Sequence, residues 1–145
     1  MAQTSPPICR FLFTYGTLMS FAGGRMGQAQ RDRLAREQAS PPVAATAKGR
    51  LFDLGRYPGF VETAGEAIVR GELRELADPV RTLAWLDDYE GIVRGHHDHN
   101  EYARVERQVT LADGQMITAW IYLYLKPSGG LREIPDGRWT APSID

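Results

Sequence analysis

The sequence predicts an α+β fold in which antiparallel strand pairing dominates. A short apolar run ends in a glycine turn near residue 16, two segments carry the signals of helices, and other apolar stretches alternate with the period of strands. In chain order these elements are strand, helix, several strands, helix and hairpin. That order is typical of an α+β fold with largely antiparallel pairing.

The first half of the chain begins with a buried strand at residues 11–13. Good helix formers dominate residues 27–38 and stop before Ser40-Pro41-Pro42, which predicts a helix. Residues 43–54 alternate and predict one strand, which a turn containing Gly55, Pro58 and Gly59 ends.

The next segment predicts two strands and a second helix. Residues 60–76 alternate, with a break near Gly65. Asp78-Pro79 has the form of a helix start, with an acid at the N-cap and proline in the first turn. Gly91 supplies the stop of that helix.

The last strands form a predicted hairpin. Residues 102–111 and 116–125 alternate around Asp113-Gly114, which is the signal of a two-residue turn. We expect Tyr122 and Tyr124 to lie on opposite faces of the second strand. The tail from Lys126 is rich in proline and glycine, with Trp139 as an anchor.

Composition excludes several classes of function. The 145 residues fit a single domain, 1–145, and the net charge of −1 carries no footprint of a nucleic-acid or anionic-membrane partner. A single cysteine, Cys9, forms no internal disulfide and favours a reducing compartment. With no signal peptide and no membrane-spanning run, we expect a cytoplasmic protein.

Tyr15-Gly16-Thr17-Leu18 is the first candidate site. A strand that turns sharply at glycine can leave successive backbone N–H groups pointing at one spot, where they hold a carboxylate. The alternative is that Gly16 only permits a tight turn.

Three acids at the end of the second helix form the second candidate site. Negative charge there opposes the helix dipole, and Asp87 shares a helix face with Glu90. If Glu90 projects into a cleft, the dipole and desolvation both raise its pKa toward the range of a general base. Asp87 and Asp88 then tune Glu90 by like-charge repulsion. The alternative is a solvated acid.

An ordered set of short motifs carries a family resemblance. In chain order they are Tyr15-Gly16-Thr17-Leu18, Tyr57-Pro58-Gly59, Gly71-Glu72-Leu73, Leu86-Asp87-Asp88-Tyr89-Glu90-Gly91, Tyr102 with Arg104, and Ala119-Trp120-Ile121-Tyr122. Each is common alone, but the set resembles the gamma-glutamylcyclotransferase-like family, including the AIG2-like proteins of bacteria and plants.

This resemblance implies a small mixed, largely antiparallel β-barrel flanked by helices, with a pocket at its mouth. It implies an enzyme of intramolecular amide cyclisation, which converts a γ-glutamyl amine or amino acid to 5-oxoproline and a free amine. Glu90 matches the catalytic glutamate. The substrate-binding residues would be Tyr15, Gly16, Thr17, Leu18, Tyr57 and Tyr122. Neither metal nor organic cofactor is required.

Two alternatives remain open beside an enzyme. One is a small-molecule-binding or regulatory module that keeps the fold and performs no turnover. The other is a metal-binding domain built on His96-His97-Asp98-His99, although a solvated loop explains these residues better, because no cysteine or further histidine is available to complete a site. The sequence leaves the released amine and the oligomeric state undetermined.

Overall fold

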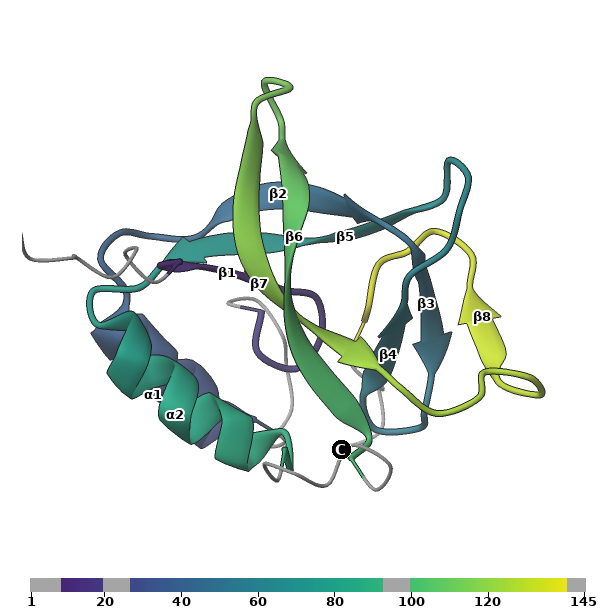
Figure 1. Cartoon of the computed structure of the whole chain (residues 1–145), viewed down its shortest axis with the longest axis horizontal. Coiled ribbons are helices and arrows are strands. Elements are labelled where there is room, and N and C mark those ends of the chain that lie inside the picture. Colours follow the sequence, from purple (N-terminus) through teal and green to yellow (C-terminus); the bar gives the residue numbers. More distant parts are fainter. Residues whose placement is uncertain (1–8, 20–26, 93–99, 141–145) are drawn as a thin grey trace, which may run out of the picture.

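A closed five-stranded barrel forms the centre of the protein in the computed structural model, which describes residues 9–19, 27–92 and 100–140 (Figure 1). Its strands lie in the order β1-β5-β2-β6-β7. Their bounds are β1 Phe11–Thr14, β5 Ile68–Glu75, β2 Val43–Lys48, β6 Tyr102–Leu111 and β7 Met116–Tyr124. Neighbours pair antiparallel, except that β1 and β7 close the barrel in parallel. The predicted α+β class and largely antiparallel barrel are confirmed.

A separate three-stranded sheet lies beside the barrel. It contains β4 Pro58–Val61, β3 Arg50–Asp53 and β8 Arg132–Ile134, in that order. The prediction of one strand over residues 43–54 is therefore wrong, because β2 and β3 separate at Gly49 and belong to different sheets. A Cβ at Gly49 would lie 2.5 Å from the Phe60 ring, so the chain bends where only glycine fits.

The predicted turn after β3 is shorter than expected. The Leu54 N–H donates to the Tyr57 carbonyl at 3.0 Å, and β4 already begins at Pro58. Pro58 and Gly59 are thus strand residues. The β6–β7 hairpin also differs from its prediction, because three residues, 112–114, lie between its last bonded pair: the Leu111 N–H donates to the Gln115 carbonyl.

Two helices pack together against one side of the barrel (Figure 1). They are α1 Gln28–Glu37 and α2 Pro79–Tyr89, so both predicted helices are confirmed. Asp78 caps α2 by accepting from the Arg81 N–H at 3.2 Å. Gly91 ends this helix with a φ of 73°, in the left-handed region that favours glycine.

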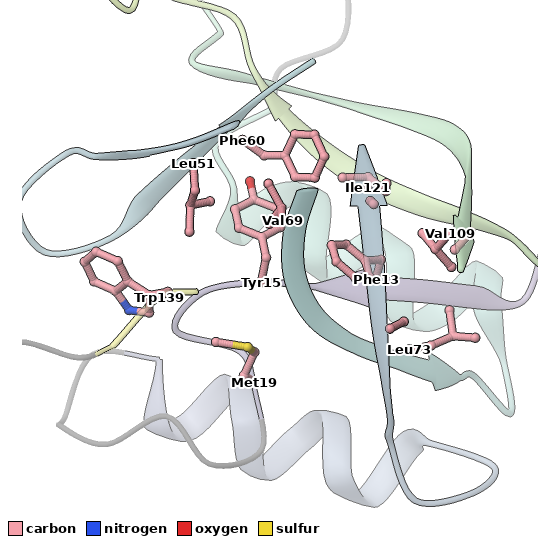
Figure 2. Packing of buried hydrophobic residues seen from close by; sticks show 13 residues of the cluster. Phe13, Tyr15, Met19, Leu51, Phe60, Val69, Leu73, Val109, Ile121 and Trp139 are labelled. Carbon is pink, nitrogen blue, oxygen red and sulfur yellow. The ribbon is translucent and has the colours of Figure 1, made fainter. Parts of the chain in front are cut away.

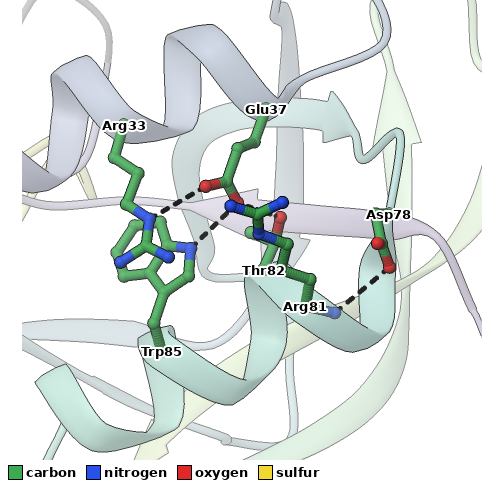
Figure 3. Close-up of polar contacts among 6 residues, drawn as sticks. All are labelled: Arg33, Glu37, Asp78, Arg81, Thr82 and Trp85. Carbon is green, nitrogen blue, oxygen red and sulfur yellow. Dashed lines mark hydrogen bonds and ion pairs between the residues drawn. The ribbon is translucent and has the colours of Figure 1, made fainter.

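Glu37 joins the two helices (Figure 3). Its Oε1 accepts hydrogen bonds from the Thr82 hydroxyl at 2.6 Å and from the Trp85 indole at 2.9 Å. Its Oε2 pairs with Arg33 at 2.8 Å. Burial alone would raise the pKa of Glu37, but these hydrogen bonds outweigh it and hold the pKa at about 2. The contact fixes α2, and with it the helix end that carries the predicted catalytic acid.

Side chains of β1 alternate between two apolar cores. Phe13 enters the core shared by the barrel and the second sheet, where Phe60 and Trp139 also pack (Figure 2). Trp139 is 4% exposed, so the expected anchor of the tail is confirmed. Leu12 enters the second core, between barrel and helices. The chain after β1 therefore emerges at the boundary between the two cores.

Candidate active site

A cavity of about 410 Å³ opens where the end of β1, the end of α2 and the start of β4 meet. All seven residues that the sequence singled out line this cavity: Tyr15, Gly16, Thr17, Leu18, Tyr57, Glu90 and Tyr122. Glu101, Tyr102 and Pro58 also contribute to the wall. The structure thus brings together segments that are distant in sequence, while the role of each residue stays a prediction.

The segment after β1 forms a tight turn at the cavity wall. The Met19 N–H donates to the Gly16 carbonyl at 3.0 Å. Gly16 packs so closely on Pro58 that a Cβ would lie 2.8 Å from the proline ring. In the described part of the chain, the N–H groups of Gly16, Thr17 and Leu18 meet no acceptor. Within the described residues these three N–H groups are candidate donors for a ligand with oxygen acceptors.

Glu90 lines the same cavity as this turn, at the end of α2. It is the C-cap residue, and its N–H donates to the Leu86 carbonyl at 2.8 Å. Burial raises the pKa of its carboxyl to about 7, with further contributions from the carboxylates of Glu101 and Asp87. A carboxyl with this pKa exchanges its proton near neutral pH, as a general acid and base must.

Glu101 is the residue that sequence reasoning missed. It lies just before β6, in a polar stretch without a motif, and lines the cavity with Glu90. The Tyr57 hydroxyl donates to its Oε1 at 2.9 Å. Among the neighbouring charges, Glu101 has the largest effect on the pKa of Glu90. No signal in the sequence indicates this pairing, because it depends on the closure of the barrel.

Asp87 supports the site from behind the cavity wall. Arg104 binds it through two hydrogen bonds, from Nε at 2.8 Å and from Nη2 at 3.0 Å. Arg104 is thus half of an ion pair with Asp87. Asp88, in contrast, is exposed and absent from the cavity wall.

The tyrosine hydroxyls around the cavity donate to protein acceptors. Tyr15 donates to the Tyr122 carbonyl at 2.5 Å, and Tyr102 to the Pro58 carbonyl at 2.8 Å. Burial raises the pKa of Tyr57 to about 12, and those of Tyr15 and Tyr102 well above their ordinary range. These hydroxyls therefore stay protonated at neutral pH and fix the wall of the cavity, which leaves proton exchange to Glu90.

Tyr122 and Tyr124 share a face of β7, so the expectation that they lie on opposite faces is wrong. Side chains two residues apart on a strand point the same way, and both pack in the second core. Only Tyr122 lines the cavity. Tyr124 instead packs on Tyr102, with ring centroids 5.7 Å apart.

The histidines of the proposed metal-binding alternative, at positions 96, 97 and 99, lie outside the described residues. Across residues 9–19, 27–92 and 100–140, no group of three or more His, Cys, Asp or Glu side chains is arranged to hold a metal ion. Neither helix of this described part has the length and apolar character needed to cross a membrane.

Comparison with known proteins identifies the family. The model of the family described as gamma-glutamyl cyclotransferase, AIG2-like, matches residues 12–141. The chain belongs to this family. The resemblance found in the sequence is therefore confirmed over most of the chain.

Individual family members are related to the chain at modest identity. The gamma-glutamylcyclotransferase family protein YtfP of Escherichia coli is 37% identical over 90 residues, which span 62% of this chain and 66% of YtfP. A Vibrio cholerae protein, named provisionally as a gamma-glutamylcyclotransferase, is 32% identical over 128 residues, covering 88% of this chain and 93% of its own.

Solved structures confirm the AIG2-like fold. The solution structure of E. coli YtfP superposes with a TM-score of 0.54 at 27% identity, covering 89% of this chain and 95% of YtfP. The crystal structure of a mouse AIG2-like protein gives a TM-score of 0.57 at 20% identity, covering 94% and 97% of the two chains.

Proposed function

We propose that the protein is a gamma-glutamyl cyclotransferase that converts a γ-glutamyl amine or amino acid to 5-oxoproline and a free amine. Glu90 serves as general base and then as general acid. The observation that carries this proposal is that Glu90, with a pKa of about 7, lines the same cavity as residues 16–18, whose N–H groups meet no acceptor among the described residues.

The turn at residues 16–18 binds the α-carboxylate of the substrate. Its N–H groups are donors without an acceptor in the described structure, and a carboxylate accepts several such bonds at once. The wall next to it is aromatic, with Tyr15, Tyr57 and Tyr102 held by their own hydrogen bonds. This fixed wall confines the γ-glutamyl chain to a folded shape, so that the amine lies near the γ-carbonyl carbon.

Proton transfer is the main task left to a side chain. At neutral pH the α-amine is protonated and cannot attack, so ionised Glu90 first removes a proton from it. The free amine then attacks the γ-carbonyl carbon, a C–N bond forms, and negative charge develops on the carbonyl oxygen. Glu90 returns this proton to the leaving nitrogen, and the original C–N bond breaks as the carbonyl re-forms. The ring nitrogen then loses its second proton to Glu90, which passes it to the released amine, so the five-membered lactam and an ammonium ion are the products.

The energetics favour so simple a site. Ring closure is intramolecular, so correct folding of the substrate supplies much of the rate acceleration. A backbone N–H that the carboxylate leaves free can stabilise the developing oxyanion, and such a donor contributes about 3 kcal/mol in other acyl transfers.

The test is turnover of a panel of γ-glutamyl amines and γ-glutamyl amino acids, with 5-oxoproline measured as product. Glu90→Gln should lower kcat by roughly 10²- to 10⁴-fold while ligand binding persists. Asp88→Asn is the matched control, because Asp88 is an exposed acid on the same helix end, and it should retain activity.

Two outcomes would contradict the proposal. Full activity of Glu90→Gln would remove Glu90 from the mechanism. Thermal stabilisation by γ-glutamyl compounds, with no 5-oxoproline formed after long incubation, would favour a binding or regulatory module on the same fold.

A further inference from the structure

Two arginines bind the backbone of the turn after β1. Nη1 of Arg31, on α1, donates to the Thr17 carbonyl at 2.8 Å. Nη2 of Arg74, on β5, donates to the Leu18 carbonyl at 3.0 Å. Neither arginine lines the cavity, whereas Thr17 and Leu18 do. Two successive carbonyls of the turn are therefore held by guanidinium groups that do not line the cavity.

These contacts determine where the N–H groups of the turn point. In a trans peptide the C=O and N–H of one unit point in opposite directions. The Thr17 carbonyl shares its peptide unit with the Leu18 N–H, so Arg31 fixes the orientation of this N–H, which points away from the guanidinium. The Leu18 carbonyl shares its unit with the Met19 N–H, which closes the turn on Gly16. Arg74 thereby fixes the unit that closes the turn.

Arg74 is an unusual residue to find in this position. It is 1% exposed, and its nearest carboxylate, on Glu72, lies 3.8 Å away, beyond hydrogen-bond distance. Its Nη1 donates to the Gln38 side chain at 2.6 Å, while its Nε meets no acceptor among the described residues. A buried ion pair this long recovers little of the cost of taking the two charges out of water, so the pairing with Glu72 alone does not account for a charge at this position. The hydrogen bond to the Leu18 carbonyl gives the buried guanidinium a structural role in the turn.

We propose that Arg74, assisted by Arg31, is a positioning residue for the carboxylate-binding turn. The hydrogen bond from Arg74 fixes the peptide unit that closes the turn, and its buried positive charge lies beside the donors of the turn. Arg31 binds and polarises the unit whose N–H, that of Leu18, is offered to an anionic ligand. A carboxylate ligand should therefore depend on Arg74 far more than a neutral ligand of the same shape. The identity of that carboxylate as the substrate's α-carboxylate rests on the proposed function.

The test compares 5-oxoproline with its uncharged carboxamide, 5-oxoprolinamide, by calorimetric titration of the full chain. Arg74→Met, of similar length, should weaken 5-oxoproline binding at least tenfold and raise KM more than it lowers kcat. Its effect on the carboxamide should be less than threefold. Arg74→Lys retains the charge but not the planar guanidinium. Its affinity for 5-oxoproline should therefore lie between those of the wild type and Arg74→Met.

Two further variants complete the test: Arg31→Met is a second test of the inference, and Arg33→Met is its control. Arg31 is only partly buried, so its replacement should fold even if Arg74→Met does not, and it should also weaken 5-oxoproline selectively. Arg33 lies on the same helix but pairs with Glu37, away from the turn, so Arg33→Met should leave the preference for the carboxylate unchanged. A merely structural role would lower the melting temperature and weaken both ligands equally.

The outcomes separate this inference from the proposed function. If the wild type binds 5-oxoproline without turning over any γ-glutamyl compound, catalysis is disproved and the binding comparison still decides the role of Arg74. Unchanged 5-oxoproline affinity in folded Arg74→Met, or in Arg31→Met if the former does not fold, overturns the inference. A wild type that neither binds 5-oxoproline nor turns over substrate overturns both.

Discussion

The hydroxyl of Tyr122, on β7, donates a hydrogen bond of 2.7 Å to Oδ1 of Asp87, on α2. Arg104, on β6, binds the same carboxylate through two further hydrogen bonds. Asp87 therefore connects the barrel to the helix that carries Glu90. Because its charge also raises the pKa of Glu90, this connection couples the packing of the helix to the chemistry of the cavity.

Replacement of Asp87 by asparagine should shift the pH profile of the proposed activity. The amide can still accept a hydrogen bond, but the negative charge beside Glu90 is lost, so the pKa of Glu90 should fall. The acid limb of kcat/KM against pH then moves to lower pH. Asp88→Asn, which changes an exposed acid one residue away, should leave the limb in place. Identical profiles for both variants would disprove the electrostatic coupling.

Glu101→Gln should move the acid limb of kcat/KM against pH to lower pH values, and further than Asp87→Asn does. Glu101 is the larger of the two charge contributions to the raised pKa of Glu90. The glutamine oxygen can still accept from the Tyr57 hydroxyl, so we expect little change in melting temperature. A limb that shifts less than in Asp87→Asn, or toward higher pH, would contradict this ranking.

Local chemistry explains what the sequence could predict of this fold. Asp78 with Pro79 begins α2 and Gly91 ends it, and both signals depend only on neighbouring residues. The break at Gly49 could not be read in the same way, because it is set by contact with Phe60 in another strand. The three-residue strand β8 exists only because β3 offers it an edge.

The candidate site likewise contains residues that the sequence could predict and residues that it could not. Its motif residues, such as Gly16 and Glu90, were predicted from family resemblance, and the structure places them on one cavity. Glu101 and Arg74 were not predicted, since each acts on a partner far along the chain. Their contributions depend on distances that exist only after the barrel closes.

Glu90 should make the folded protein less stable as pH rises toward neutrality. Its folded pKa of about 7 lies above its ordinary value of 4.5, so between these pH values the folded state holds a proton that the unfolded chain has released. The free energy of unfolding should therefore fall as the pH rises from 4.5 to about 7, and the contribution of Glu90 should be constant above that pH. Glu90→Gln cannot lose that proton, and its stability relative to wild type should increase by on the order of 2 kcal/mol.

Urea unfolding of wild type and Glu90→Gln from about pH 4 to about pH 8 measures this effect. Because other titrating groups are common to both proteins, only the difference between their free energies of unfolding is compared. A difference that stays constant with pH would show that Glu90 is solvated in the folded state, and the proposed mechanism would lose its physical basis.

The close approach of β5 to β1 should make Gly71 intolerant of any side chain. A Cβ there would overlap the Thr14 carbonyl oxygen and lie 2.8 Å from the Phe13 ring. Since a backbone oxygen cannot move aside as a side chain can, β1 would have to separate from β5 next to the turn that follows Thr14. We expect Gly71→Ala to lower the free energy of unfolding by about 3 kcal/mol.

Gly129→Ala is the matched control for this substitution. A Cβ at Gly129 meets no atom within 4 Å, and this glycine has no positive φ, so the change should stay within about 0.5 kcal/mol of wild type. Gly71→Ala should also lose more activity than Gly129→Ala, because displacement of Thr14 moves the adjoining N–H donors of residues 16–18. Equal melting temperatures for the two variants would show that β1 and β5 are not packed as closely as the structure places them.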